Sequence, residues 1–159
     1  MLLEGKKIFI TGGCSGMGFA TARLCVAEGA QVTIFDFADD ETMAKVADAV
    51  GGTCHTFHGD VTDSASVDAG IAFAVERMGG LDGVVNCAGG GRTGLLVDIP
   101  DEDFDWTVKL CLYGTFYVNR AAARAMIAAG KGGSIVNFSS INADMVSEFT
   151  PAFAASYCS

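Results

Sequence analysis

The amino-acid sequence predicts a doubly wound α/β fold, in which helices cover both faces of a parallel sheet. The first observation is that short apolar runs and longer helical patterns alternate from one end of the chain to the other. The second is that no internal repeat, linker or low-complexity segment interrupts this alternation. A length of 159 residues is typical of one domain. We therefore expect a single domain over residues 1–159, with strand order 3-2-1-4-5 and a ligand crevice at the carboxyl ends of the strands.

Local signals place each element along the chain. The apolar run at residues 8–10 predicts a short buried strand, and apolar residues at helical spacing over residues 19–28 predict a helix that Gly29 ends. Further strands are expected at residues 31–36, 53–58, 81–86 and 134–138. Further helices are expected at residues 41–50 and 64–78 and from Pro100 to about residue 129, the last with three acids in its first turn.

Composition excludes several classes of function. A net charge of −9, with Lys and Arg scattered along the chain, argues against a nucleic-acid or membrane partner, since either needs a basic patch. The six cysteines form no C-x-x-C pair, and His55 and His58 lie three apart on an expected strand, where their side chains point to opposite faces. We therefore expect no metal site. Without a signal sequence or a long apolar run, we expect a soluble, cytoplasmic protein with reduced thiols.

The glycine-rich turn after the first strand carries the clearest functional signal. Its spacing is Thr-Gly-x-x-x-Gly-x-Gly over residues 11–18, between a strand and a helix. The first glycine lets the chain turn sharply, the second lets the backbone approach a pyrophosphate, and the third lets the helix pack close to the strand. Free N–H groups at the start of the helix favour a phosphate. An ordinary strand-to-helix turn is the alternative. We predict a Rossmann-type cofactor site that includes Gly12, Ser15, Gly16, Met17 and Gly18.

Asp36 and Phe37 follow the second strand and bear on the choice of cofactor. A carboxylate at this position accepts hydrogen bonds from the ribose hydroxyls of NAD and repels the extra phosphate of NADP. No Arg stands nearby to bind that phosphate. The alternative role for Asp36, a cap on the next helix, suits Asp39 or Asp40 better. We therefore expect NAD as the cofactor.

The glycine spacing resembles that of the short-chain dehydrogenase/reductase family, and later motifs deepen the resemblance. Asp60-Val61 resembles the family motif that holds the adenine ring, although an Asp in an ordinary Gly-Asp turn fits the spacing equally well. Residues 86–89, Asn-Cys-Ala-Gly, resemble the family's Asn-Asn-Ala-Gly turn. The resemblance implies that Asp60, Val61, Asn86, Ala88 and Gly89 lie beside the cofactor.

The resemblance also implies catalytic residues. Residues 133–140 resemble the family's fifth strand, which makes Ser140 the group that hydrogen-bonds the substrate oxygen; a helix-capping serine is the alternative. Alignment of Gly114-Thr115-Phe116 with the family's Gly-x-Phe puts Cys111 where the family has a catalytic Asn. A thiol lacks the donors and acceptor of an amide, so a proton relay at this position is in question.

The last residues admit two alignments with the family's catalytic Tyr. In the first, Tyr157 is that tyrosine and the sequence ends before the lysine four positions later. In the second, Phe153 holds the tyrosine position and Tyr157 the lysine position. We favour the first, because a longer loop is a mild change whereas the second removes both catalytic groups. The lysine matters because lowering a tyrosine pKa from about 10 by roughly three units takes about 4 kcal/mol.

The resemblance covers the chain from Lys6 and implies the amino-terminal portion of a family member, truncated before the last strands. It implies an NAD(H)-dependent oxidoreductase that transfers hydride between nicotinamide and a small alcohol or carbonyl substrate; the alternative is a non-catalytic dinucleotide-binding module. We expect little or no dehydrogenase activity from these residues alone. Residues 90–97 and 144–151 are expected to edge the substrate pocket, with Arg92 either meeting an anion or solvating the surface. Family members often form homo-oligomers, which is possible here too.

Overall fold

The computed structural model describes residues 1–145, 147–152 and 155. Within them the strands are β1 (Lys7–Thr11), β2 (Gln31–Asp36), β3 (Cys54–His58), β4 (Gly83–Asn86) and β5 (Ser134–Asn137). The helices are α1 (Gly16–Ala27), α2 (Asp40–Val50), α3 (Ser64–Met78), α4 (Asp101–Val108) and α5 (Gly114–Ala128). A π-helical turn, η1 (Lys109–Tyr113), joins α4 to α5, and a short 3-10 helix, η2 (Ile141–Ala143), follows β5.

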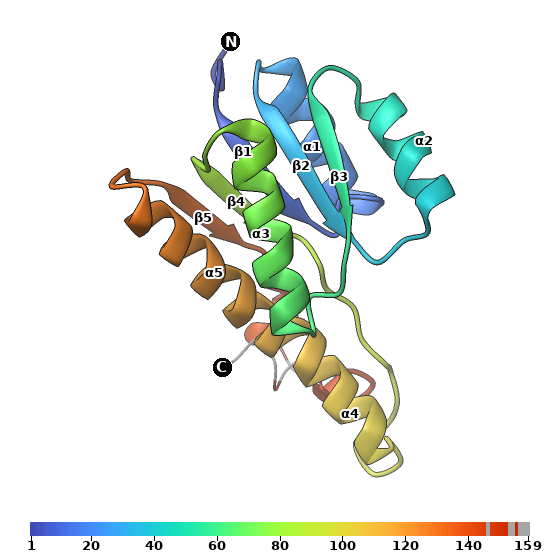
Figure 1. Cartoon of the computed structure of the whole chain (residues 1–159). Helices are drawn as coiled ribbons and strands as arrows, with labels where there is room; N and C mark the ends of the chain where they lie inside the picture. The colour runs from blue at the N-terminus through green and yellow to red at the C-terminus, as the bar shows by residue number, and fades with distance from the viewer. Residues whose placement is uncertain (146, 153–154, 156–159) are drawn as a thin grey trace.

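The strands form one parallel sheet in the order β3-β2-β1-β4-β5, which confirms the predicted fold class and strand order. Helices α1 and α2 cover one face, and α3 and α5 cover the other (Figure 1). Alternation along β1 explains the two layers: Phe9 packs with α3 and α5, whereas Ile8 and Ile10 pack with α1 and α2. Parallel strands buried on both faces need continuous apolar runs, and β1 and β2 supply them.

Helix caps account for the accuracy of several predicted boundaries. The side chain of Asp39 accepts a hydrogen bond from Thr42 N at 2.8 Å, and that of Asp63 accepts one from Ala65 N at 3.0 Å. The hydrogen bond from Thr42 lowers the pKa of Asp39 below its usual value. Asp39 is therefore the cap that begins α2, which leaves Asp36 for another role.

Most predicted boundaries differ from the observed ones by at most one residue, and three differences are larger. Helix α1 begins at Gly16 rather than at residue 19, because Gly16 and Gly18 already belong to its first turn. Strand β4 begins at Gly83 rather than at residue 81, because the side chain of Asp82 bonds Lys7 N at 3.0 Å. The long helix predicted over residues 100–129 is interrupted by η1, a feature that apolar spacing does not reveal.

Strand β5 lies at the edge of the described sheet, and its Val136 is 51% exposed. In the part of the chain that the structure describes, we find no helix with both the length and the apolar character needed to cross a membrane.

Candidate functional site

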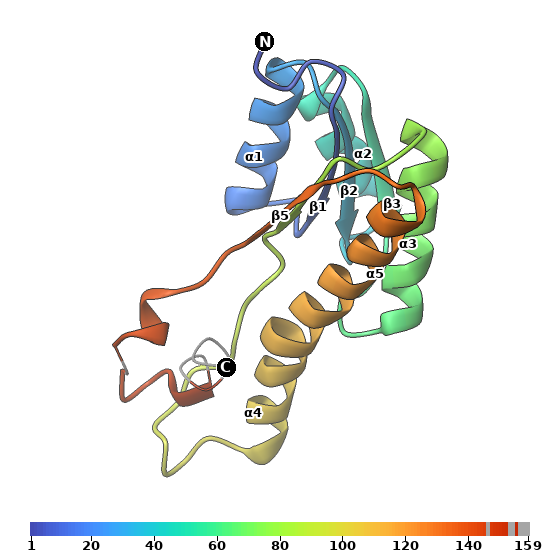
Figure 2. The ribbon, with the colours of Figure 1, turned by 90° about the vertical axis from the view of Figure 1, so that its left-hand side faces the viewer.

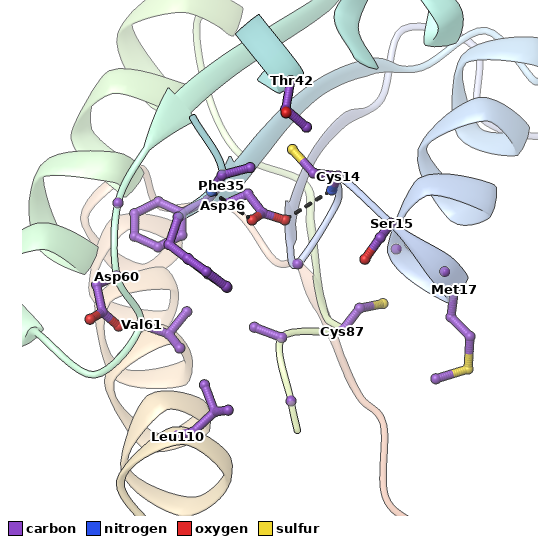
Figure 3. A pocket seen from close by; sticks show the side chains of 18 residues that line it. Cys14, Ser15, Met17, Phe35, Asp36, Thr42, Asp60, Val61, Cys87 and Leu110 are labelled. Carbon is purple, nitrogen blue, oxygen red and sulfur yellow. Dashed lines mark hydrogen bonds between the residues drawn. The ribbon is translucent and has the colours of Figure 1, made fainter. Parts of the chain in front are cut away.

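A cavity of about 440 Å³ opens at the carboxyl ends of the central strands, where the strand order reverses beside β1 (Figure 3). Four segments line it: the glycine-rich turn, residues 35–38 after β2, residues 59–61 after β3, and residues 87–89 after β4. The crevice therefore lies at the place that the predicted fold requires.

The glycine-rich turn is shaped by steric contacts. Gly12 has a φ of +66°, and a Cβ on it would lie 2.8 Å from Ala88 Cα. A Cβ on Gly18 would collide with the carbonyl oxygen of Gly12 and lie 2.8 Å from its carbonyl carbon. Gly16 has a φ of +51°, and no atom lies within 4 Å of where its Cβ would be. The turn thus lets α1 pack tightly on β1 and leaves open space above Gly16.

Ser15 and Met17 lie at the start of α1. Ser15 is the N-cap residue of α1, and its hydroxyl makes no capping hydrogen bond. Its side chain points into the cavity, as Figure 3 shows, and Met17 also lines the cavity. The positive end of the helix dipole and an uncommitted hydroxyl therefore meet at one place, an arrangement suited to a phosphate.

Asp36 is held rigidly at the edge of the cavity. Its Oδ2 accepts a hydrogen bond from Cys14 N at 2.9 Å and its Oδ1 accepts one from Ala38 N at 3.1 Å (Figure 3). The residue is only 8% exposed, whereas the neighbouring Phe37 is largely exposed and lines the same cavity. A carboxylate has further lone pairs on both oxygens, so Asp36 retains the capacity to accept hydrogen bonds from a ligand.

Asp60 and Val61 also line the cavity. Asp60 Oδ1 accepts a hydrogen bond from Thr62 N at 2.8 Å, so the side chain shapes its own turn as the alternative interpretation expected. Val61 is buried and packs into the core formed by α3 and α5. The structure thus brings both residues to the cavity while giving each a structural role.

Asn86, at the end of β4, is hydrogen-bonded to side chains of β1, β5 and α5. Its Nδ2 donates to Asn119 Oδ1 at 2.8 Å and to Asn137 Oδ1 at 2.7 Å, and its Oδ1 accepts from Thr11 Oγ1 at 3.4 Å. Ala88 N donates to the same threonine hydroxyl at 3.2 Å. Asn119 and Asn137 were not predicted as partners of Asn86, because nothing in their local sequence marks them. This network anchors the turn that carries Ala88 and Gly89, both of which line the cavity.

Ser140 lies in a second cavity of about 290 Å³, which shares Met17 and residues 87–89 with the first. Ser140 Oγ accepts hydrogen bonds from the backbone N and the Nδ2 of Asn142, each at 3.2 Å, and caps η2. Ser140 therefore caps a helix, as the alternative interpretation expected, and it also lines a cavity that adjoins the first; its role toward a substrate stays a prediction. Tyr157 and Phe153, the alternatives for the catalytic tyrosine, lie outside the described residues.

Cys111 lies in η1 and is 5% exposed. Its thiol donates to Gly90 O at 3.1 Å and so ties the π-helical turn to the loop after β4. Leu110, from the same turn, lines the first cavity. No sequence motif indicated that Leu110, Cys14, Thr42 or Cys87 would line it.

The described cysteines Cys14, Cys25, Cys54, Cys87 and Cys111 are free thiols. Burial, together with the nearby Asp36 carboxylate, raises the pKa of Cys14 to about 12, and burial raises the pKa of Cys87 as well. Both thiols at the cavity are therefore protonated at neutral pH and poor nucleophiles. Within residues 1–145, 147–152 and 155, no group of three or more His, Cys, Asp or Glu is placed to hold a metal ion.

Comparison with known proteins places the chain in a family. A family model described as short chain dehydrogenase matches residues 6–157. The chain is 39% identical to a sorbitol dehydrogenase of Cereibacter sphaeroides over 88% of its length, and 37% identical to an L-rhamnose 1-dehydrogenase (NAD(P)(+)) of Azotobacter vinelandii over 97%. A 2,5-dichloro-2,5-cyclohexadiene-1,4-diol dehydrogenase of Sphingobium indicum is 40% identical over 87% of the chain.

The solved structures that are similar to this chain belong to the same family as these relatives. The crystal structure of a short chain dehydrogenase from Mycobacterium smegmatis superposes with a TM-score of 0.92 at 35% identity, covering 99% of this chain and 67% of that one. The chain belongs to the short-chain dehydrogenase family, whose members are oxidoreductases that bind a nicotinamide dinucleotide. It spans 54%, 56% and 64% of the lengths of the sorbitol, cyclohexadienediol and rhamnose dehydrogenases.

Proposed function

We propose that this chain binds NAD(H) and supplies part of the catalytic site of a dehydrogenase that acts on a small alcohol or carbonyl compound. The observation that carries the proposal is the position of Asp36 at the edge of the cavity, held there by two backbone N–H groups. Among the described residues that line this cavity there is no Lys, Arg or His. A cofactor with a phosphate on the adenosine ribose would therefore face a fixed carboxylate and no neutralising charge, which favours NAD over NADP.

Each cavity segment fits one part of the cofactor. Asp36 would accept hydrogen bonds from the adenosine ribose hydroxyls, with Phe37, Asp60 and Val61 around the adenine. Ser15 and the start of α1 suit the pyrophosphate, where the backbone at Gly16 leaves room for close approach. Met17, Asn86, Ala88 and Gly89 line the way from this cavity to Ser140. When bound, the nicotinamide ring would supply hydride transfer.

Ser140 is suited to hold the substrate oxygen. A hydroxyl has one donor hydrogen and two lone pairs, and Ser140 Oγ accepts from both nitrogens of Asn142. The hydroxyl hydrogen is then oriented away from Asn142 and is available to donate to a carbonyl or alcohol oxygen. We assign to Tyr157 the transfer of the proton to or from that oxygen.

A pair of cofactor titrations tests the proposal. NADH and NADPH fluorescence would be titrated with the chain, and we expect NADH to bind at least about 10-fold more tightly, a difference of ~1.4 kcal/mol. Asp36→Asn keeps the shape of the side chain and removes its charge, so it should lower this preference about 10-fold. Asp48→Asn, an exposed charge change on α2, is the matched control and should leave the preference unchanged. Binding of neither nucleotide would contradict the cofactor proposal; tighter binding of NADPH would contradict the role of Asp36.

A further inference from the structure

Two segments extend from the sheet beside Ser140, and we call them the substrate arms: residues 90–99 after β4, and the described part of residues 139–152 after β5. Figure 2 shows both reaching away from the sheet in the same direction. They are joined to each other, because Gly94 N donates to Phe149 O at 3.0 Å. The second arm is also joined to the serine, because Thr150 Oγ1 donates to Asn142 Oδ1 at 3.0 Å and Asn142 bonds Ser140. The arms therefore border the space that a substrate held by Ser140 would occupy.

The arms carry large apolar side chains that are not buried. The exposed fractions are 72% for Leu96, 86% for Val97, 67% for Ile141, 66% for Met145 and 52% for Phe149. Several exposed apolar side chains on two joined segments, rather than scattered singly, are typical of a surface that binds a ligand. The wall of the cavity at Ser140 is mixed: Phe138, Met17 and Ala88 are apolar, whereas Asn86, Ser139 and Asn142 are polar.

The charges on the arms are unfavourable for an anion. The one basic residue on the described arms, Arg92, has its Nε 3.8 Å from Asp103 Oδ1 and its guanidinium 5.0 Å above the ring of Trp106. The other ionisable residues there are the acids Asp98, Asp144 and Glu148, and α4 adds further acids in its first turn. On the described arms, a carboxylate or phosphate approaching Ser140 would therefore meet mainly negative charge, and the single cation there is already paired with Asp103.

We infer that the substrate is an uncharged secondary alcohol or ketone with an apolar body. This inference rests on the proposed function and narrows it. The exposed apolar side chains of the arms suit an apolar frame, and Ser140 suits a single oxygen function on it. We expect hydroxy acids, sugar phosphates and other anionic substrates to bind more weakly, because the acids of the arms repel them.

Trp106 provides a direct test, because it is the only tryptophan in the sequence and stacks on Arg92 at the first arm. Its fluorescence would be followed while the chain, saturated with its cofactor, is titrated with cyclohexanone or with 3-oxocyclohexane-1-carboxylate. These ketones differ by one carboxylate. We expect the neutral ketone to bind at least about 10-fold more tightly at low ionic strength. The difference in affinity between the two ketones should become smaller at high ionic strength, because salt screens the repulsion of the anion.

Two variants separate the arms from the rest of the surface. Phe149→Ser should weaken binding of cyclohexanone several-fold, whereas Ile127→Ser should not change it. Ile127 is 78% exposed at the last turn of α5, away from the arms, so it controls for the loss of an exposed apolar side chain. Replacing Asp144 with Asn and Glu148 with Gln together should improve binding of the anionic ketone alone.

The outcomes distinguish this inference from the proposed function. Equal or tighter binding of the anionic ketone, or no binding of either ketone, would overturn the inference about substrate class, even where NADH binds as proposed. A loss of cyclohexanone binding in Ile127→Ser as large as that in Phe149→Ser would also overturn it. Failure to bind NADH or NADPH is measured separately, in the cofactor titration, and bears on the proposed function.

Discussion

The part of the molecule that we propose to bind the cofactor consists of β1, β2 and the turn between β1 and α1, and we call it the cofactor half. It and the substrate arms are built in opposite ways. At the carboxyl ends of β1 and β2, Ile10, Ile34 and Phe35 are at most 1% exposed. Between β1 and α1, backbone contacts leave no space for a side chain at Gly12 or Gly18. On the arms, Leu96 and Val97 are mostly exposed. The cofactor half is thus constrained by close packing, whereas the arms are constrained mainly by hydrogen bonds between loops. A rigid half that binds a constant cofactor and a loosely packed half that meets a variable substrate are a natural division of roles.

The largest expected effect concerns the reactivity of Cys14, which lies in the cofactor half. Because the pKa of Cys14 is raised to about 12 from 9.0, its thiolate fraction at pH 8 should be about 1000-fold lower than in the unfolded chain. We expect alkylation of Cys14 by iodoacetamide to be slower in the folded chain by about this factor, as measured by mass spectrometry with and without urea. Equal rates in the two states would show that this half is more open than the structure indicates.

The raised pKa also predicts a pH dependence of stability. The folded pKa of Cys14 lies above the unfolded value, so the folded state holds its proton where the unfolded state releases it. The contribution to the free energy of unfolding is fully present below about pH 9 and is lost as the pH rises from 9 toward 12. Cys14→Ser should reduce that loss, which urea titrations at several pH values would measure.

Gly18→Ala tests the packing that shapes the cofactor half. The added methyl group would collide with the carbonyl of Gly12, a backbone group that cannot move without shifting β1. We expect a loss of about 3 kcal/mol in the free energy of unfolding, at the upper end of overpacking, together with a loss of NADH binding. Gly132→Ala is the control, since no atom lies within 4 Å of its Cβ position, and it should change stability by less than about 0.5 kcal/mol. Similar stabilities of the two variants would contradict the close contact of α1 and β1.

Asn86→Ala tests the junction between the two regions. Removal of the amide leaves the side-chain oxygens of Asn119 and Asn137 without their donor, which should cost about 2 kcal/mol. A double-mutant cycle with Asn119→Ala should show a coupling above about 0.5 kcal/mol, because the two side chains are directly bonded. Strict additivity of the two substitutions would show that the network contributes nothing.

The same contrast explains what the sequence could and could not reveal. The bounds of β2 and α3 were predicted as found, because an apolar run, a capping Asp and a terminal glycine all act locally. The glycine-rich turn and Asp36 were placed correctly at the cavity, because their spacing reflects a fixed geometry. The turn η1 was missed, since one extra residue in a helical turn leaves the apolar pattern nearly intact.

Other features escaped prediction because they form only on folding. The partners of Asn86 come from α5 and β5, and no local pattern marks two isolated asparagines. The pairing of Arg92 with Asp103 and Trp106 depends on how the first arm folds back on α4, so the sequence left its role open. The choice between Tyr157 and Phe153 stays a prediction, as do the assigned roles of the site residues.

The smallest effect is expected on the arms, and one substitution compares them directly with the core. Val97→Ser removes an apolar side chain that is 86% exposed, so it should change the free energy of unfolding by less than about 0.5 kcal/mol. Val84→Ser makes the same change in β4, where the side chain is 1% exposed and packs with α3 and α5, and should cost more than about 2 kcal/mol. Urea denaturation of both variants measures the difference. A cost at Val97 comparable to that at Val84 would mean that the first arm is buried in solution, and would remove the apolar surface on which the proposed substrate class depends.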